Sequence, residues 1–332
     1  MSTFAAAVLF LGVLAYAVLG GADYGAGFWD LTAGGAARGR RPRHLVDEAL
    51  APVWEANHVW LIFCLVMLWT GFPQAFAAIM TTLYIPLGLA ALGVVVRGCG
   101  FAFRSVMVRT DQQRVAGAAF AVSSILVPFF LGTVAGALAS GRVPSAGNGD
   151  PVHSWVNPTS LLGGVLAVLV AALVAGVFLT AEASRRGDAT LARWFARRAR
   201  LAAAGAGAVA LAGIGILRAD APRLFHELLT RGLALVVLSA GLVLVTVLLL
   251  WRLPPRVLQG LAAGAAATII LGWGVAQYPY LLGTHLPIAA AAAPTPTLSA
   301  LTVVAAAALV LVVPSMGLLF ALQQRGRLGK AP

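Results

Sequence analysis

Side chains that could do chemistry gather within one apolar stretch of the chain. The stretch contains Trp54, Glu55, Asn57, His58 and Trp60, and its other residues are those of a membrane span. A charged side chain at the centre of a bilayer costs roughly 2.5–3.5 kcal/mol on insertion scales, so such residues are retained mainly for function. On a helix, Glu55 and His58 are neighbours at i and i+3, and Trp54 and His58 stack at i and i+4. The spacing therefore predicts a polar relay flanked by tryptophan side chains.

Two further carboxylates lie near this stretch. Glu48 precedes Glu55 by seven residues, which on a continuous helix places both on one face about 10 Å apart. Asp23 lies between Gly21 and Gly25, whose spacing lets another helix backbone approach closely. Because the loop after the first segment is short, we expect an antiparallel hairpin with Asp23 and Glu55 at similar depth. Asp23 can serve the relay or helix packing, and both roles stay open.

Other polar residues have simpler interpretations. His58 could ligate haem, but it is the one histidine well inside a predicted span, and a bis-histidine site needs a second. We therefore favour a relay or hydrogen-bonding role for it. Arg97 is expected to cap the inner end of the third segment rather than bind quinone. Trp54 and Trp60 are expected to serve packing or the interface.

The composition is that of a polytopic helical membrane protein. The 332 residues are 60% hydrophobic and 10% charged, whereas soluble domains carry about 25% charged residues. The net charge of +12 does not indicate nucleic-acid binding, because the arginines lie mainly in loops. Cys64 and Cys99 form no metal or disulfide motif and are interpreted as small hydrophobic residues.

Nine membrane spans are expected in a single all-α domain over residues 1–332. The second span ends near residue 69, with a kink expected at Pro52, and a loop holding four arginines (residues 36–43) precedes it. The other spans cover residues 4–31, 75–96, 115–138, 161–181, 201–217, 233–251, 257–276 and 298–322. The polar relay belongs to residues 1–140, and residues 155–325 form a mainly packing half.

The basic residues set the expected orientation. With the N-terminus outside and the C-terminus inside, all of them fall inside except Arg142, Arg218, Arg223 and Arg231. Short loops rich in Lys and Arg stay in the cytoplasm.

Four runs in order carry a resemblance to subunit II of cytochrome bd quinol oxidases. They are Gly21-Ala22-Asp23-Tyr24-Gly25-Ala26-Gly27, Trp54-Glu55-Ala56-Asn57-His58-Val59-Trp60-Leu61-Ile62, Arg97-Gly98-Cys99-Gly100-Phe101-Ala102-Phe103-Arg104 and Trp273-Gly274-Val275-Ala276-Gln277-Tyr278-Pro279-Tyr280. Glu55 and Asp23 stand where the family's motifs have their acids. The chain departs from some members at Ala102, where they carry an acid, and at His58, where they carry glutamine.

The resemblance implies a fold of two four-helix bundles plus a peripheral helix, in a bacterial plasma membrane. It implies a complex that oxidises quinol and reduces dioxygen to water, with haems b558, b595 and d in the partner subunit I. This chain alone is expected to bind no haem. It would stabilise subunit I and supply part of a cytoplasmic proton path. The other implied partners are membrane lipids and quinone, with room for a small accessory subunit and no nucleic acid.

Glu48 is expected to replace the acid missing at position 102 as the cytoplasmic entrance of the path. The simpler alternative is a surface ion pair of Glu48 with Arg41, Arg43 or His44. Two other functions stay open for the chain. A proton-coupled transporter would carry polar residues in both halves, and a purely structural subunit would tolerate the loss of Glu55.

Overall fold

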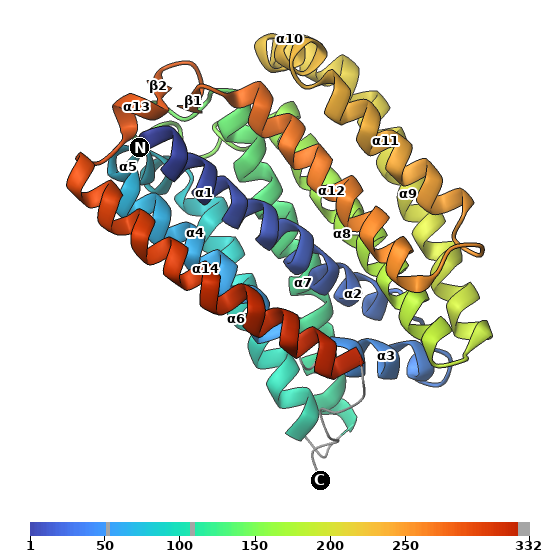
Figure 1. Cartoon of the computed structure of the whole chain (residues 1–332). Coiled ribbons are helices and arrows are strands. Elements are labelled where there is room, and N and C mark those ends of the chain that lie inside the picture. Colours follow the sequence, from blue (N-terminus) through green and yellow to red (C-terminus); the bar gives the residue numbers. More distant parts are fainter. Residues whose placement is uncertain (51–53, 107–109, 325–332) are drawn as a thin grey trace.

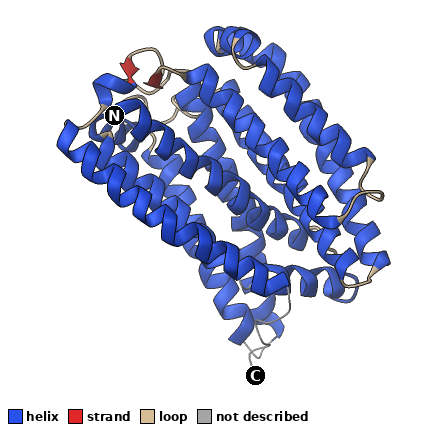
Figure 2. Cartoon of the chain, viewed as in Figure 1, coloured by secondary structure: helices blue, strands red, loops and turns tan. Residues whose placement is uncertain are grey.

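The computed structural model describes residues 1–50, 54–106 and 110–324. Within these ranges the side chains of residues 36–37, 50, 54–56, 104–106, 110–114, 319–320 and 323–324 are not described. The described chain is almost entirely helical, with one small antiparallel hairpin at one end (Figure 2).

The elements follow one another in a simple order. The first span consists of α1 (Ser2–Ala15), a π-helical segment η1 (Tyr16–Gly20) and α2 (Gly21–Leu31). Next come α3 (Ala36–Leu50), α4 (Trp54–Gly71), α5 (Pro73–Thr82), α6 (Tyr84–Val106) and α7 (Thr110–Ala139). The second half contains α8 (Pro158–Arg185), α9 (Ala189–Asp220), α10 (Pro222–Thr230), α11 (Leu233–Leu248) and α12 (Pro255–Gln277). The hairpin of β1 (Tyr280–Leu282) and β2 (Leu286–Pro287), then α13 (Ile288–Ala291) and α14 (Thr295–Gln324), complete it.

The all-α membrane fold that the composition predicts is confirmed. Within the described residues, seven helices are long and apolar enough to cross a membrane. Two bent pairs, α4 with α5 and α10 with α11, bring the count to as many as nine. The count of nine spans and the two-bundle arrangement stay predictions.

Helix α8 lies at the centre of the packing. It packs against α9, α7, α2 and α12, while α14 runs along the outside of α4 and α1 (Figure 1). The N-terminus and the end of α14 lie at opposite ends of the bundle (Figure 1).

Glycines let the central helices approach one another. A Cβ on Gly25 of α2 would lie 1.9 Å from the carbonyl oxygen of Ala171 in α8. On α7, a Cβ on Gly132 or Gly136 would lie 2.5 Å from backbone atoms of α8. Small residues allow such close backbone contact, so the approach predicted from Gly21-x-x-x-Gly25 is confirmed at Gly25. Gly132-x-x-x-Gly136 on α7 has the same spacing and makes the same kind of contact.

The loop predicted at residues 36–43 is wrong, because these residues form the first half of α3. Figure 1 shows α3 lying across one end of the bundle, and it contacts α2 and α8. Leu45 and Val46 of α3 are fully buried in the same core cluster as α8 residues. Burial of one face supplies most of a helix's stability, which the arginine-rich composition did not reveal.

Two predicted spans have different limits. The span predicted at residues 75–96 is interrupted at Leu83, between α5 and α6. The ring of Pro86 would clash with the carbonyl of Thr82 in a continuous helix. The predicted sixth span instead begins at Ala189, because the side chain of Asp188 accepts a hydrogen bond from the Leu191 amide and caps α9. The kink expected at Pro52 lies outside the described residues.

Candidate functional site

The most buried charges of the described chain form one ion pair between α2 and α6. The guanidinium of Arg97 donates to both carboxylate oxygens of Asp23, with Nη2 at 2.7 Å from Oδ1 and Nη1 at 2.9 Å from Oδ2. Nη2 also donates to the Asp23 carbonyl at 3.3 Å. Both side chains are 1% exposed. Two-pronged Arg–carboxylate contacts of this kind are the strong ones.

Neighbouring side chains make the remaining contacts of the Arg97 guanidinium. Its Nε donates to Ser124 Oγ at 2.9 Å. Its Cζ lies 4.7 Å from the ring centroid of Tyr24 and 4.8 Å from that of Phe120. A guanidinium between two aromatic rings gains cation–π attraction, which is largest where water is excluded. The pair and its neighbours therefore join α2, α6 and α7. The two charges compensate each other, and the Arg97 Nε, Nη1 and Nη2 groups all donate hydrogen bonds.

Glycines next to the pair set its dimensions. A Cβ on Gly27 of α2 would lie 2.2 Å from Ser124 Oγ, and one on Gly100 of α6 would lie 2.8 Å from the Ala116 carbonyl oxygen. Without these side chains, the three helices approach closely enough for Arg97 to reach both Asp23 and Ser124. The family-like motifs at residues 21–27 and 97–104 thus supply both the charges and the space for them.

The predicted role of Arg97 needs correction. It was expected to cap the end of its helix, whereas its side chain is buried against Asp23, 74 residues away in sequence. The pairing favours the packing role for Asp23, and its relay role stays a prediction.

The π-helical segment η1 lies one turn before Asp23 and is held by α4. The amide nitrogen of Asn57 donates to the Leu19 carbonyl at 3.3 Å. A π-helical turn disturbs the regular i→i−4 bonding of a helix and often occurs at functional sites. Tyr16 of η1 shares a 3.0 Å hydroxyl contact with Tyr24. The expected packing of the first two predicted spans is confirmed, because α1 and η1 contact α4.

The start of α4 brings other predicted site residues together. Asn57 is 3% exposed and Trp60 is 6% exposed, while His58 is half-buried. Within the described residues, Asn57 Oδ1 and Trp60 Nε1 are buried without a hydrogen-bond partner. The side chains of Trp54 and Glu55 lie outside the described part. Their roles, and the common depth of Glu55 and Asp23, stay predictions.

Glu48 lies in a surface ion-pair network at the end of the bundle. Its Oε2 accepts a bond from Arg186 Nη1 and lies 3.4 Å from His44 Nδ1. Of the three surface partners considered from the sequence, His44 is confirmed. Arg41 and Arg43 instead pair with Asp188 and Asp30. The common helix face expected for Glu48 and Glu55 requires a continuous helix through residues 51–53, which lie outside the described part.

Several site residues were missed from the sequence. Ser124, Tyr24 and Phe120 surround Arg97. Asp30 is 4% exposed, and its Oδ1 forms an ion pair with Arg43 Nε at 2.8 Å. The one available signal was the run containing Tyr24, next to Asp23. Among the described residues no group of three or more His, Cys, Asp or Glu is placed to hold a metal ion.

Comparisons with known proteins agree with this arrangement. The family model for subunit II of cytochrome bd terminal oxidases matches residues 1–323. Subunit 2 of the Bacillus subtilis cytochrome bd ubiquinol oxidase is 29% identical over 166 residues, 49% of this chain and 47% of that protein. Subunit 2 of the Escherichia coli K12 cytochrome bd-I ubiquinol oxidase is 29% identical over 171 residues, 48% of this chain and 44% of that protein.

These matches span about half the length of the curated relatives. A chain of the bd oxidase from Geobacillus thermodenitrificans has a similar structure over nearly the whole length. The TM-score is 0.78 with 26% identity, and the alignment covers 97% of this chain and 98% of that chain. The chain therefore belongs to the family of cytochrome bd terminal oxidase subunit II.

Proposed function

We propose that this chain is the haem-free subunit of a membrane complex that oxidises quinol and reduces dioxygen to water. The observation that carries the proposal is the family match over residues 1–323. The names of the curated relatives, which are ubiquinol oxidases, support quinol as the substrate class. In the proposed complex the chain spans a bacterial plasma membrane nine times, as two four-helix bundles plus a peripheral helix. Its N-terminus is outside and its C-terminus inside.

The haems b558, b595 and d belong, in this proposal, to the partner subunit I. Four of the five histidines of this chain are exposed, and the fifth, His58, is half-buried. This distribution of histidines supports the assignment of the haems to subunit I. Its own contribution is to support subunit I. A stoichiometric Soret band on this chain purified alone would contradict the assignment.

The proposal includes a proton path from the cytoplasm through Glu48, His58, Asn57 and Glu55. Glu55 belongs to a predicted membrane span, where carboxylates are retained mainly for function, and Glu48 is exposed at the end of the bundle. Asn57 Oδ1, which is buried and has no hydrogen-bond partner among the described residues, supports the path, because such an acceptor is suited to a water molecule. Asp23, held by Arg97 on both oxygens, contributes a fixed charged pair beside the path.

One competing function is a purely structural subunit, and the Arg97–Asp23 pair favours it because both charges are satisfied within the chain. The buried charged residues of the described part are Asp23, Asp30 and Arg97, all within the N-terminal third. A transporter with polar residues in both halves gains no support from this distribution.

The test is oxygen consumption by the assembled oxidase carrying Glu55→Gln or Glu48→Gln, with Asp47→Asn as the matched control. A proton path through this chain requires Glu55→Gln to lower turnover while the haem content of the complex is unchanged. Turnover of Glu55→Gln equal to that of the control would leave the structural role. If only Glu48→Gln matches the control, the entrance lies elsewhere, in the partner subunit.

A further inference from the structure

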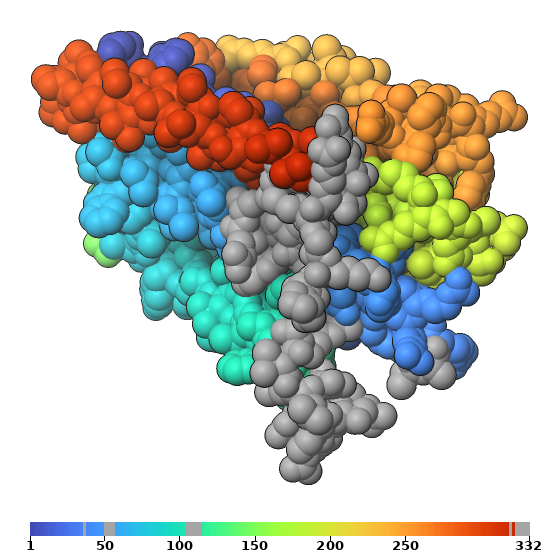
Figure 3. Space-filling model, turned by 60° about the horizontal axis from the view of Figure 1, so that its bottom comes forward, coloured from blue at the N-terminus to red at the C-terminus, as the bar shows by residue number. Residues whose placement is uncertain are grey.

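A pocket of about 460 Å³ opens at the end of the bundle where α3 meets the turn between α8 and α9. Pockets that hold small organic ligands measure about 300–1,000 Å³. Figure 3 shows α3, in blue, beside the start of α9, in yellow-green, on this exposed face. Two ion pairs join these elements, from Arg41 to Asp188 and from Arg186 to Glu48.

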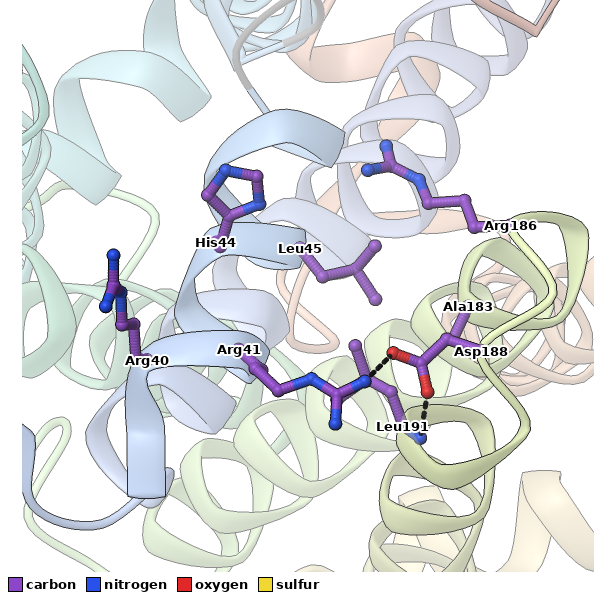
Figure 4. Close-up of a pocket in the computed structure, with 8 residues that line it drawn as sticks. All are labelled: Arg40, Arg41, His44, Leu45, Ala183, Arg186, Asp188 and Leu191. Atoms are coloured by element: carbon purple, nitrogen blue, oxygen red, sulfur yellow. Dashed lines mark hydrogen bonds and ion pairs between the residues drawn. The ribbon is translucent and has the colours of Figure 1, made fainter. Parts of the chain in front are cut away.

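The pocket has an apolar floor and a basic rim. Leu45, Ala183 and Leu191 form the floor, and all three are buried. Arg40, Arg41 and His44 of α3 and Arg186 of the turn form the rim. In Figure 4 Arg41 extends across to Asp188, and the side chain of Arg186 points back toward α3.

Asp188 also lines the pocket, and its negative charge is compensated by neighbouring groups. Asp188 Oδ2 accepts from Arg41 at 2.5 Å and Oδ1 accepts from the Leu191 amide at 3.0 Å. The bond from the Leu191 amide, followed by the Arg41 charge, lowers the pKa of Asp188 below its usual range. Its charge is thus compensated from both sides.

Some N–H groups of the arginines that line the pocket form no bond within the described part of the chain and can donate to a ligand. A guanidinium has five N–H donors, and Asp188 receives one bond from Arg41. Arg40 is exposed and forms no ion pair with another described residue. Arg186 is held by Glu182 and Glu48, so it contributes a fixed position and little net charge. The free donors of Arg41 therefore form the anion-binding edge, and Arg40, on the other side of α3 (Figure 4), adds its positive charge to the rim.

The position of the pocket along the bundle indicates a lipid ligand. It lies at the turn between two helices long and apolar enough to cross a membrane, Pro158–Arg185 and Ala189–Asp220. The first has 28 residues and is therefore about 42 Å long, close to the thickness of about 40–45 Å of a bilayer with its headgroups, so we expect the turn at headgroup level. Trp194 lies less than one turn after Leu191, with the Arg198 guanidinium carbon 3.2 Å from its ring centroid. Tryptophans of this kind mark the membrane interface. A free phosphate would use the rim alone, whereas a phospholipid would also cover the apolar floor.

We propose that this pocket binds the phosphodiester headgroup of an anionic membrane phospholipid, with the phosphate at the free donors of Arg41, the charge of Arg40 at the rim, and the glycerol region over Leu45 and Leu191. Basic pockets between helices on the cytoplasmic side bind such headgroups in membrane proteins generally. The bound lipid joins α3 to the α8–α9 turn and so stabilises the end of the bundle that carries Glu48.

The test uses the protein purified from membranes in detergent together with its bound subunits. The probe is dioctanoyl phosphatidylglycerol, and its affinity is obtained from the rise of the thermal unfolding midpoint with probe concentration. Arg40→Gln should weaken binding about fivefold, which corresponds to about 1 kcal/mol for each basic residue near a headgroup. Arg38→Gln is the matched control, since Arg38 is exposed on the same helix outside the pocket.

Three outcomes would overturn the proposal. Equal affinity of Arg40→Gln and the unmodified protein would show that the pocket is not used. Equal losses in Arg40→Gln and Arg38→Gln would show diffuse attraction to a basic surface. A midpoint shift by inorganic phosphate, at the same concentration, as large as that by the lipid would identify a free-anion site instead. Dioctanoyl phosphatidylcholine should bind more weakly than phosphatidylglycerol.

Discussion

Removing one partner of the Arg97–Asp23 pair should destabilise the protein more than any exposed charge change. Both side chains are 1% exposed, and Arg97 Nη2 and Asp23 Oδ1 are 2.7 Å apart. Deleting one member of a buried pair leaves an uncompensated charge, which costs about 3–5 kcal/mol. Arg97→Gln and Asp23→Asn are each expected to fall in this range.

The double variant Asp23→Asn/Arg97→Gln distinguishes a coupled pair from two separate contacts. It leaves no isolated buried charge, so its cost should be smaller than the sum of the single costs by about 2–3 kcal/mol. Arg97→Lys keeps the charge but loses the two-pronged geometry and the stacking on Tyr24 and Phe120, so it should lie between the unmodified protein and Arg97→Gln.

The assay is equilibrium or thermal unfolding of the purified complex in detergent, with Arg38→Gln as an exposed control. Additive single costs in the double variant would refute a coupled pair. A cost for Arg97→Gln no larger than that of Arg38→Gln would refute the burial of the charges. Oxygen consumption per assembled complex adds a functional reading. If Asp23 acts only in packing, Asp23→Asn should lower the amount of complex but not the turnover of what assembles.

Three further predictions concern contacts between distant segments of the chain, and all are measured as shifts in the thermal unfolding midpoint. Gly25→Ala should cost about 1–3 kcal/mol or more through overpacking, because its Cβ would lie 1.9 Å from a backbone oxygen. Gly21→Ala, whose nearest atom is at 3.9 Å, should be tolerated, and equal effects of the two would contradict the close contact. Asp220→Asn should cost about 1.5–3 kcal/mol, since Asp220 accepts bonds from Arg142 at 2.6 and 3.0 Å. Asn57→Leu should cost about 1–3 kcal/mol by leaving the Leu19 carbonyl without its donor, and a neutral result would show that η1 does not depend on α4.

The sequence by itself determined the features that depend on composition and local spacing. Long apolar stretches with short connections specify membrane helices whatever their neighbours, so the all-α membrane fold was predicted. The spacing of Gly21 and Gly25 predicted a close helix contact, because glycine has no Cβ to keep the two backbones apart. The order of the motifs around Asp23, Glu55 and Arg97 was enough to indicate the family.

Only the tertiary structure decided which polar groups meet. Arg97 reaches Asp23 across 74 residues, and Arg186 reaches Glu48 across 138. Such pairs depend on the rotation and tilt of whole helices, which are set by packing against neighbouring helices and not by spacing along one chain segment. The helix at residues 36–50 could not be predicted for the same reason. It is stabilised by the burial of Leu45 and Val46 against α8, which the polar composition of the segment does not indicate.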